Sequence, residues 1–259
     1  MGETLNIKGI CVSLAKRIIP TLLCRGRQLV KGIGFDSWRS VGLAAQAVRI
    51  HSMRGVDELI LLDITATAEG RGPDLDLVRE LSEVCFMPLS VGGGIRNVAD
   101  VRALLRAGAD KVVVNSAAWE VDGLLDAIAN EFGRQALVVS IDADEEHQVH
   151  IRSGKQPVGL DAVRWASVVA EHAAGEIMLN SVSRDGTMGG YDLDLISAVS
   201  TAVEVPVIAA GGAGTYEHLY QAIRNGADAV AAGAMFCFTD HTPKGAAEYL
   251  QARGVEVRV

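Results

Sequence analysis

The sequence has few aromatic residues, few cysteines and no excess of positive charge. Phenylalanine, tryptophan and tyrosine make up 5% of its 259 residues, and 24 lysines and arginines face 32 aspartates and glutamates, for a formal net charge of −8. A nucleic-acid-binding surface needs clustered positive charge, so the composition argues against nucleic acid as a partner. A local phosphate site is still compatible with this balance, because backbone N–H groups bind phosphate without net positive charge.

The four cysteines, Cys11, Cys24, Cys85 and Cys237, are far apart and form no C-x-x-C pair. Metal sites and redox dithiols normally have closer spacing, so we expect buried free thiols and neither a metal nor a cofactor site. No apolar run approaches the roughly 20 residues of a membrane span. The first residues lack the basic and long apolar regions of a secretion signal, so we expect a cytoplasmic protein with no membrane contact.

Short β-branched runs alternate with amphipathic stretches along the whole chain. We expect strands at 17–22, 58–63, 87–91, 111–115, 136–142, 176–180, 206–210 and 229–233. Helical patterns lie near 42–54, 74–83, 97–107, 121–131, 161–173, 193–202, 215–225 and 244–253. Eight strand–helix units predict an α/β fold, the (β/α)8 TIM barrel, with a doubly wound open sheet as the alternative. We expect residues 1–13 to be an N-terminal extension and 14–259 a single barrel domain.

An internal repeat divides the predicted barrel into two duplicated half-barrels. The segment ELILLDIT at 58–65 is matched by EIMLNSVS at 176–183, 118 positions later. At the same spacing, two Gly-Gly pairs and two Gly-Ala-Asp turns match, at 93–94 with 211–212 and at 108–110 with 226–228. The repeat therefore predicts two pseudo-equivalent sites at the carboxyl ends of the strands.

Glycine-rich turns follow the third and seventh predicted strands, at 92–95 and 211–214, and each is echoed one strand later by Asn115-Ser116 or Gly233-Ala234. Glycine lets the backbone approach an anion closely, and loops after strands 7 and 8 of such barrels often hold phosphate. One such cluster is as compatible with a plain tight turn. Two at matching positions favour a ligand with two phosphates.

Charged residues stand at both ends of the predicted strands. Asp63, Asp142 and Asp185 stand at strand ends on the catalytic face. A carboxylate there acts as general acid or base, or else caps a helix or closes a loop by a hydrogen bond. Lys31, after the first strand, contacts an anionic substrate or faces solvent. The opposite ends carry a set of four charges that predicts an ion-pair network, with a structural or a gating role: Arg17, Glu58, Lys111 and Glu176.

Several motifs in order resemble one family. They are LAKRIIP (14–20), VDELILLDIT (56–65), VGGGI (91–95), GADKVVVNSAA (108–118), VVSIDA (138–143), GEIMLNSVSRDGT (175–187) and VIAAGGAG (207–214). From residue 14 onward the chain resembles the cyclase subunit of imidazole glycerol phosphate synthase. The resemblance implies a heterodimer with a class I glutaminase, whose ammonia crosses the barrel. At the catalytic face, ammonia and a bis-phosphorylated ribulosyl intermediate give imidazole glycerol phosphate and an aminoimidazole carboxamide ribotide.

The resemblance also implies residue roles. It assigns phosphate binding to Gly93, Gly94, Asn115 and Ser116 in one half, and to Asp185, Gly186, Gly212, Gly233 and Ala234 in the other. It identifies Arg17, Glu58, Lys111 and Glu176 with the family's gate to the ammonia passage. Asp110 and Gln135 match the glutaminase interface, Asp142 matches one catalytic aspartate, and Lys31, Asp63 and Asn180 are further substrate-site candidates.

The chain departs from the family where the first strand ends. The family has a second catalytic aspartate there, and this sequence has Leu23. A leucine carries no proton, so we expect crippled cyclisation if both carboxylates are needed. The following loop (34–43) also differs, and Ala210 and Cys237 replace a usual serine and histidine.

These departures are accompanied by three further motifs, CFMPL (85–89), GTMGGYDLDLI (186–196) and AAGAMF (231–236). Together they resemble a paralogous branch that serves amidotransferase systems of bacterial surface-sugar biosynthesis. Our leading hypothesis is an enzyme subunit that receives ammonia from a class I glutaminase but has altered chemistry on a phosphorylated ligand. A genuine cyclase subunit of histidine biosynthesis is the first alternative. The second is a non-catalytic scaffold that activates a glutaminase.

Overall fold

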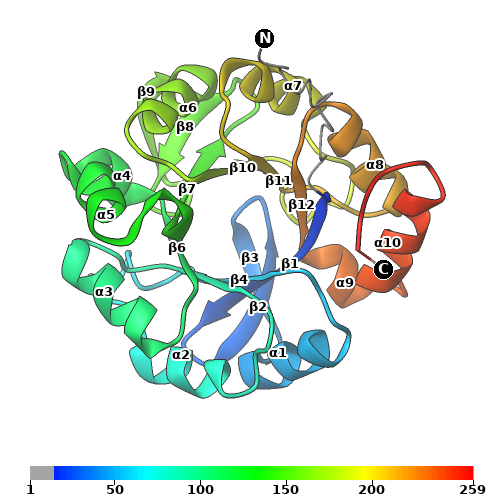
Figure 1. Cartoon of the computed structure of the whole chain (residues 1–259), viewed down its shortest axis with the longest axis horizontal. Helices are drawn as coiled ribbons and strands as arrows, with labels where there is room; N and C mark the ends of the chain where they lie inside the picture. Colours follow the sequence, from blue (N-terminus) through cyan, green and yellow to red (C-terminus); the bar gives the residue numbers. More distant parts are fainter. Residues whose placement is uncertain (1–14, 259) are drawn as a thin grey trace, which may run out of the picture.

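Parallel strands close into a barrel inside a ring of helices (Figure 1) in the computed structural model, which describes residues 15–258. The barrel strands are β1 (Arg17–Arg25), β4 (Leu59–Asp63), β5 (Leu89–Gly92), β6 (Lys111–Val114), β7 (Leu137–Ala143), β10 (Glu176–Ser181), β11 (Val207–Ala210) and β12 (Ala229–Ala232). They pair in chain order, and β12 pairs in parallel with β1 to close the circle. The fold is therefore the predicted (β/α)8 barrel, and the open sheet is excluded.

Helices cover the outside of the barrel at each position that the sequence pattern predicts. They are α1 (Ala44–Met53), α2 (Leu75–Ser82), α3 (Val98–Ala107), α5 (Leu124–Phe132), α6 (Ala162–Glu171), α7 (Leu193–Ala202), α8 (Tyr216–Arg224) and α10 (Pro243–Gln251). Side-chain caps start many of them: Asp74 accepts from the backbone N–H of Leu77, for example, at the start of α2. Within residues 15–258, no helix has the length and hydropathy that a membrane crossing requires.

Two β-hairpins and several short helices were not predicted. They are β2 (Gln28–Ile33) with β3 (Asp36–Leu43), β8 (Gln148–Ile151) with β9 (Gln156–Asp161), α4 (Ser116–Glu120), α9 (Ala234–Phe238) and the 3-10 turn η1 (Arg134–Ala136). The first strand continues beyond its predicted end because its last three residues pair antiparallel with β2. The helix expected from 42 begins at Ala44, since the preceding residues complete β3.

Alternate residues of each barrel strand face two separate cores. Outward side chains pack against the helices, as Ile18 and Leu22 of β1 do. Inward side chains form a second apolar cluster at mid-height of the barrel: Ile19, Ile60, Val113, Val138, Met178, Ile208, Ala210, Ala229 and Ala231. Because the side-chain period of a strand is two, the inner face of β1 presents Arg17 below this cluster and Thr21 and Leu23 above it.

The duplication is visible in the hydrogen bonds. Asp110 Oδ2 accepts from the N–H of Leu89 at 2.8 Å, and Asp228 Oδ2 accepts from Val207 N–H at 3.1 Å, 118 residues later. Gly108 caps α3 and Gly226 lies just after the cap of α8, and both are in the left-handed region, with φ of 110° and 106°. The two halves therefore repeat local geometry as well as sequence.

Two predictions need correction or fall outside the described part. Cys24 is buried and Cys85 half-buried, but Cys237 is exposed, so the prediction of buried thiols was wrong for Cys237. Cys11 and the predicted extension over 1–13 lie outside the described residues.

Candidate functional site

A cavity opens at the carboxyl ends of the barrel strands. Most of the predicted site residues line it: Leu23, Lys31, Asp63, Gly93, Gly94, Asn115, Ser116, Asp142, Asn180, Asp185 and Gly233. The two unpredicted hairpins supply further walls, with Phe35 and Trp38 from the β2–β3 hairpin and Ser153 from the β8–β9 turn. The cavity wall does not include three predicted phosphate residues, Gly186, Gly212 and Ala234.

Asp142 is the buried carboxylate of this cavity, with 6% of its surface exposed. Its Oδ1 accepts from the Ser140 hydroxyl and its Oδ2 from the Asn115 amide, both at 3.2 Å. Burial raises the pKa of Asp142 to about 7, and the neighbouring Asp185 carboxylate acts in the same direction, while the Ser140 hydrogen bond opposes both. A carboxyl with this pKa takes up and releases protons near neutral pH.

Leu23 lies at the top of β1, and β1 and β7 are on opposite sides of the closed barrel. Its side chain is 8% exposed, lines the cavity and pairs in the sheet with Leu62. The wall facing Asp142 is therefore apolar where the family motif has a carboxylate.

The first glycine-rich turn is built around Gly93 and Gly94. Both have positive φ, of 106° and 74°, and a Cβ on Gly93 would overlap the carbonyl oxygen of Asp63. Asp63 itself accepts from the N–H of Thr65 at 3.0 Å and pairs with Arg71 at 2.7 Å. Asp63 therefore makes loop-closing hydrogen bonds, and its part in substrate binding stays a prediction.

In the second half, the β2–β3 hairpin brings Lys31 against the turn at Gly233. Lys31 is 6% exposed, and its ammonium donates to the backbone carbonyl of Thr21 at 2.9 Å. Burial lowers the pKa of Lys31, although Cys237 and Asp185 act in the opposite direction. Burial also raises the pKa of Asp185, against the effect of Lys31. Lys31 thus faces the cavity and not solvent.

The other three phosphate candidates pack behind this wall. Gly186 lies against the carbonyl of Gly32, and Gly212 accepts from the N–H of Gly190 at 2.8 Å. Ala234 is the first residue of α9 and is buried.

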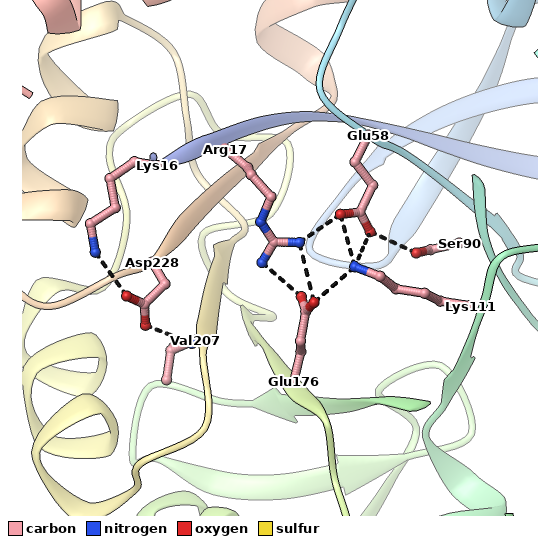
Figure 2. Close-up of polar contacts among 8 residues, drawn as sticks. All are labelled: Lys16, Arg17, Glu58, Ser90, Lys111, Glu176, Val207 and Asp228. Atoms are coloured by element: carbon pink, nitrogen blue, oxygen red, sulfur yellow. Dashed lines mark hydrogen bonds and ion pairs between the residues drawn. The ribbon is translucent and has the colours of Figure 1, made fainter. Parts of the chain in front are cut away.

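The four charges at the opposite ends of the strands form a closed cycle of ion pairs (Figure 2). Arg17 contacts Glu58 at 2.6 Å and Glu176 at 2.8 Å, and Lys111 contacts the same two carboxylates at 3.0 and 2.8 Å. Ser90 donates a further hydrogen bond to Glu58 at 2.7 Å. Although burial acts against it, the bonds from Arg17 and Lys111 leave the pKa of Glu176 below its usual value.

Asp110 and Gln135 lie on the same side of the barrel as this cycle, just before β6 and β7. Both residues are exposed. Asp110 accepts from Leu89 N–H, as described above, and Gln135 donates to the Phe132 carbonyl at 3.1 Å. Their assignment to a partner interface stays a prediction.

Two polar features escaped the sequence analysis. Arg71 holds Asp63, and His150 of β8 contacts Asp144 at 2.8 Å. Arg71 lies in the loop after β4 and His150 in the β8–β9 hairpin, and the strand and helix patterns indicated neither conformation. No motif signalled either residue.

Comparison with known proteins agrees with this architecture. Residues 17–242 match the family described as "Histidine biosynthesis protein". Proteins named "Imidazole glycerol phosphate synthase subunit HisF" from Dictyoglomus thermophilum and Chlorobium limicola are each 46% identical over 250 residues, which is 95% of this chain and 99% and 100% of theirs. The protein of that name from Dictyoglomus turgidum is 44% identical over 95% of this chain and 99% of its own. The chain therefore belongs to the histidine biosynthesis protein family, as a HisF-like, cyclase-type member.

Proposed function

We propose that this chain is the ammonia-accepting cyclase-type subunit of a glutamine-dependent synthase, in a complex with a class I glutaminase. The observation that carries the proposal is the layout of the barrel interior. A cycle of ion pairs closes one end, an apolar cluster fills the middle, and a cavity with a buried carboxylate opens at the other end.

This layout suits a small neutral molecule. Ions pay heavily to cross an apolar interior, whereas uncharged ammonia does not. Under this proposal, Arg17, Glu58, Lys111 and Glu176 are the gate, and opening it requires at least one ion pair to break. Asp110 and Gln135 lie beside the gate, on the face where the glutaminase would dock.

The cavity suits a ligand with two phosphates. Gly93, Gly94, Asn115 and Ser116 would hold one phosphate. Asp185, Gly186, Gly212, Gly233 and Ala234 mark the second site, where the buried Lys31 adds a positive charge. Asn180 neighbours Asp142 in the sheet, and Asp63 holds the first turn closed. Asp142 lies in the cavity with these two phosphate sites and is then the proton carrier, because its pKa of about 7 lets it act as both acid and base.

The names of the relatives favour imidazole glycerol phosphate synthesis as the reaction. In that reaction the ammonia joins a bis-phosphorylated ribulosyl intermediate, and ring closure gives imidazole glycerol phosphate and the carboxamide ribotide. Identity of 44–46% over nearly the whole length supports this assignment.

Leu23 favours a second candidate, in which ammonia goes to another phosphorylated acceptor, as in the surface-sugar branch. An apolar wall opposite Asp142 leaves one side of the cavity without a proton carrier. Cyclisation that uses two carboxylates would then be slow. Transfer of ammonia to an acceptor that needs only one carboxylate, Asp142, would still proceed.

Complementation of a histidine auxotroph that lacks the cyclase separates the two candidates. We would compare the wild-type chain with Leu23→Asp and Asp142→Asn, each expressed with the host glutaminase. Growth with the wild-type chain that Asp142→Asn abolishes supports the cyclase reaction. Growth with Leu23→Asp alone supports the altered acceptor.

The wild-type chain and the same two variants test the scaffold alternative. Purified chains are added to a class I glutaminase, and glutamine hydrolysis is measured with and without the ribulosyl substrate. If stimulation is equal in all three chains and no variant turns over ammonia, the catalytic proposal is wrong and a scaffold remains.

A further inference from the structure

The turn between β8 and β9 is strained and lies at the cavity. Three consecutive residues have left-handed backbone: Arg152, Ser153 and Gly154, with φ of 54°, 59° and 76°. Non-glycine residues in this region cost of order 1 kcal/mol or more each, so neighbouring groups must hold the turn.

The turn reaches three parts of the cavity wall. The N–H of Arg152 donates to the Ser116 hydroxyl at 2.9 Å, and the Ser153 hydroxyl donates to the Ile64 carbonyl at 3.2 Å. Gly154 packs against the ring of Phe35 from the other hairpin. The shape of this turn therefore fixes the wall next to the first glycine-rich loop.

His150 makes two hydrogen bonds that require both of its ring nitrogens to donate. Nδ1 is 3.1 Å from the carbonyl oxygen of Gly154, and Nε2 is 2.8 Å from Asp144 Oδ2. A carbonyl oxygen only accepts, and so does an ionised carboxylate. Both bonds exist together only when the ring is an imidazolium or Asp144 is protonated.

The surroundings of Asp144 decide between these two states. Its Oδ1 accepts from the N–H groups of Glu146 at 3.0 Å and Gln148 at 2.8 Å. Although its burial works the other way, these bonds and that from His150 lower the pKa of Asp144. Asp144 is thus the ionised partner, and the two contacts of His150 together call for a ring that donates from both nitrogens.

We propose that His150 is a positioning residue that, as an imidazolium, ties the strained β8–β9 turn to Asp144 and so holds the cavity wall beside the first glycine-rich loop. The charged groups facing it are Asp144 and, in the adjacent register position of β7, Asp142. From β9 it meets the uncharged Pro157. The link from this wall to phosphate binding rests on the proposed function, whereas the protonation of His150 does not.

The first experiment reads the ring nitrogens directly. Nitrogen-15 NMR of the histidine side chains at pH 7 should show both His150 nitrogens protonated, assigned by their loss in His150→Gln. The matched control is His147→Asn, immediately before β8, because the His147 side chain contacts Asp192 through Nε2 alone within residues 15–258. A neutral His150 with one bare nitrogen at pH 7 overturns the proposal.

The second experiment measures what the tie does. Amide hydrogen exchange at residues 152–154 should be about tenfold faster in His150→Gln than in the wild type, since a lost hydrogen bond of about 1.4 kcal/mol changes an opening equilibrium tenfold. Equal exchange in both chains would refute the tie.

Inorganic phosphate then serves as the ligand probe. NMR shifts at Gly93 and Ser116 should report binding about threefold to tenfold weaker in His150→Gln, while shifts at Gly212 and Gly233 stay unchanged. Equal weakening at both loops would mean general damage and would contradict the local role. No shift at either loop in the wild type would reject the phosphate sites of the proposed function, and the nitrogen and exchange results would still decide the role of His150.

Discussion

Replacing Glu58 should destabilise the barrel strongly, because it accepts three charged or hydroxyl donors while only 2% exposed. Glu58→Gln keeps the shape and removes the charge, so Arg17 and Lys111 would share the single carboxylate of Glu176. Removal of one partner from a buried ion pair costs about 3–5 kcal/mol. Arg17 and Lys111 have 25% and 17% of their side chains exposed, and water recovers part of this. We therefore expect a loss of about 2–4 kcal/mol, or roughly 5–15 °C in Tm.

Urea unfolding followed by circular dichroism measures this loss, and a double-mutant cycle tests its cause. Glu58→Met and Lys111→Met should each be destabilising, but the double variant should lose clearly less than the two losses added, because no uncompensated charge of this pair remains. A loss below about 1 kcal/mol for Glu58→Gln, or strict additivity in the cycle, would refute the reasoning that the network acts as a coupled buried unit.

Three further predictions address the cavity. The hydroxyl of Thr21 is buried without a hydrogen-bond partner among residues 15–258, so Thr21→Val should leave the free energy of unfolding unchanged or raise it by up to about 1 kcal/mol, and a clear loss in urea unfolding would show a hidden partner. The raised pKa of Asp142 means that the folded state binds more protons than the unfolded one, so wild-type stability should fall by roughly 4 kcal/mol at most as pH rises from about 4 to 7 and then level off. Asp142→Asn should lack this fall in denaturation curves recorded across that range, and a fall of the same size would contradict the assigned pKa. Gly93→Ala should cost about 2–4 kcal/mol because its Cβ would overlap Asp63, whereas Gly26→Ala, at φ of 56° with open space around it, should cost about 1 kcal/mol, and equal thermal shifts would argue against the close approach.

Periodicity predicted the barrel because each of its strands and outer helices is a regular element with one repeating apolar face. The two hairpins escaped because their residues serve the cavity. In β2, the buried Lys31 lines the cavity and interrupts the apolar residues. In β3 most side chains are exposed, so neither strand has a long run of buried apolar residues. The short helices α4 and α9 escaped because five residues are too few to show a period.

The site was predicted in part for a related reason. Asp142, Asn115 and the glycine turns stand next to strands whose ends the sequence reveals, so their convergence follows from the barrel itself. Lys31 was left between cavity and solvent because its direction depends on the β2–β3 hairpin. The pairing of Arg71 with Asp63, and of His150 with Asp144, depends on loop conformations that the strand and helix patterns do not specify.

The clip formed by an aspartate and a backbone N–H occurs once in each half, but the two copies now have different neighbours. Asp228 is also paired with Lys16 at 2.8 Å (Figure 2), whereas Asp110 keeps its clip and remains exposed. A fold built by duplication has this aspartate and its backbone hydrogen bond in both halves. In both copies the backbone bond that shapes the turn is kept, so the rest of the aspartate can take different neighbours: Lys16 for Asp228, and under the proposed function the glutaminase for Asp110.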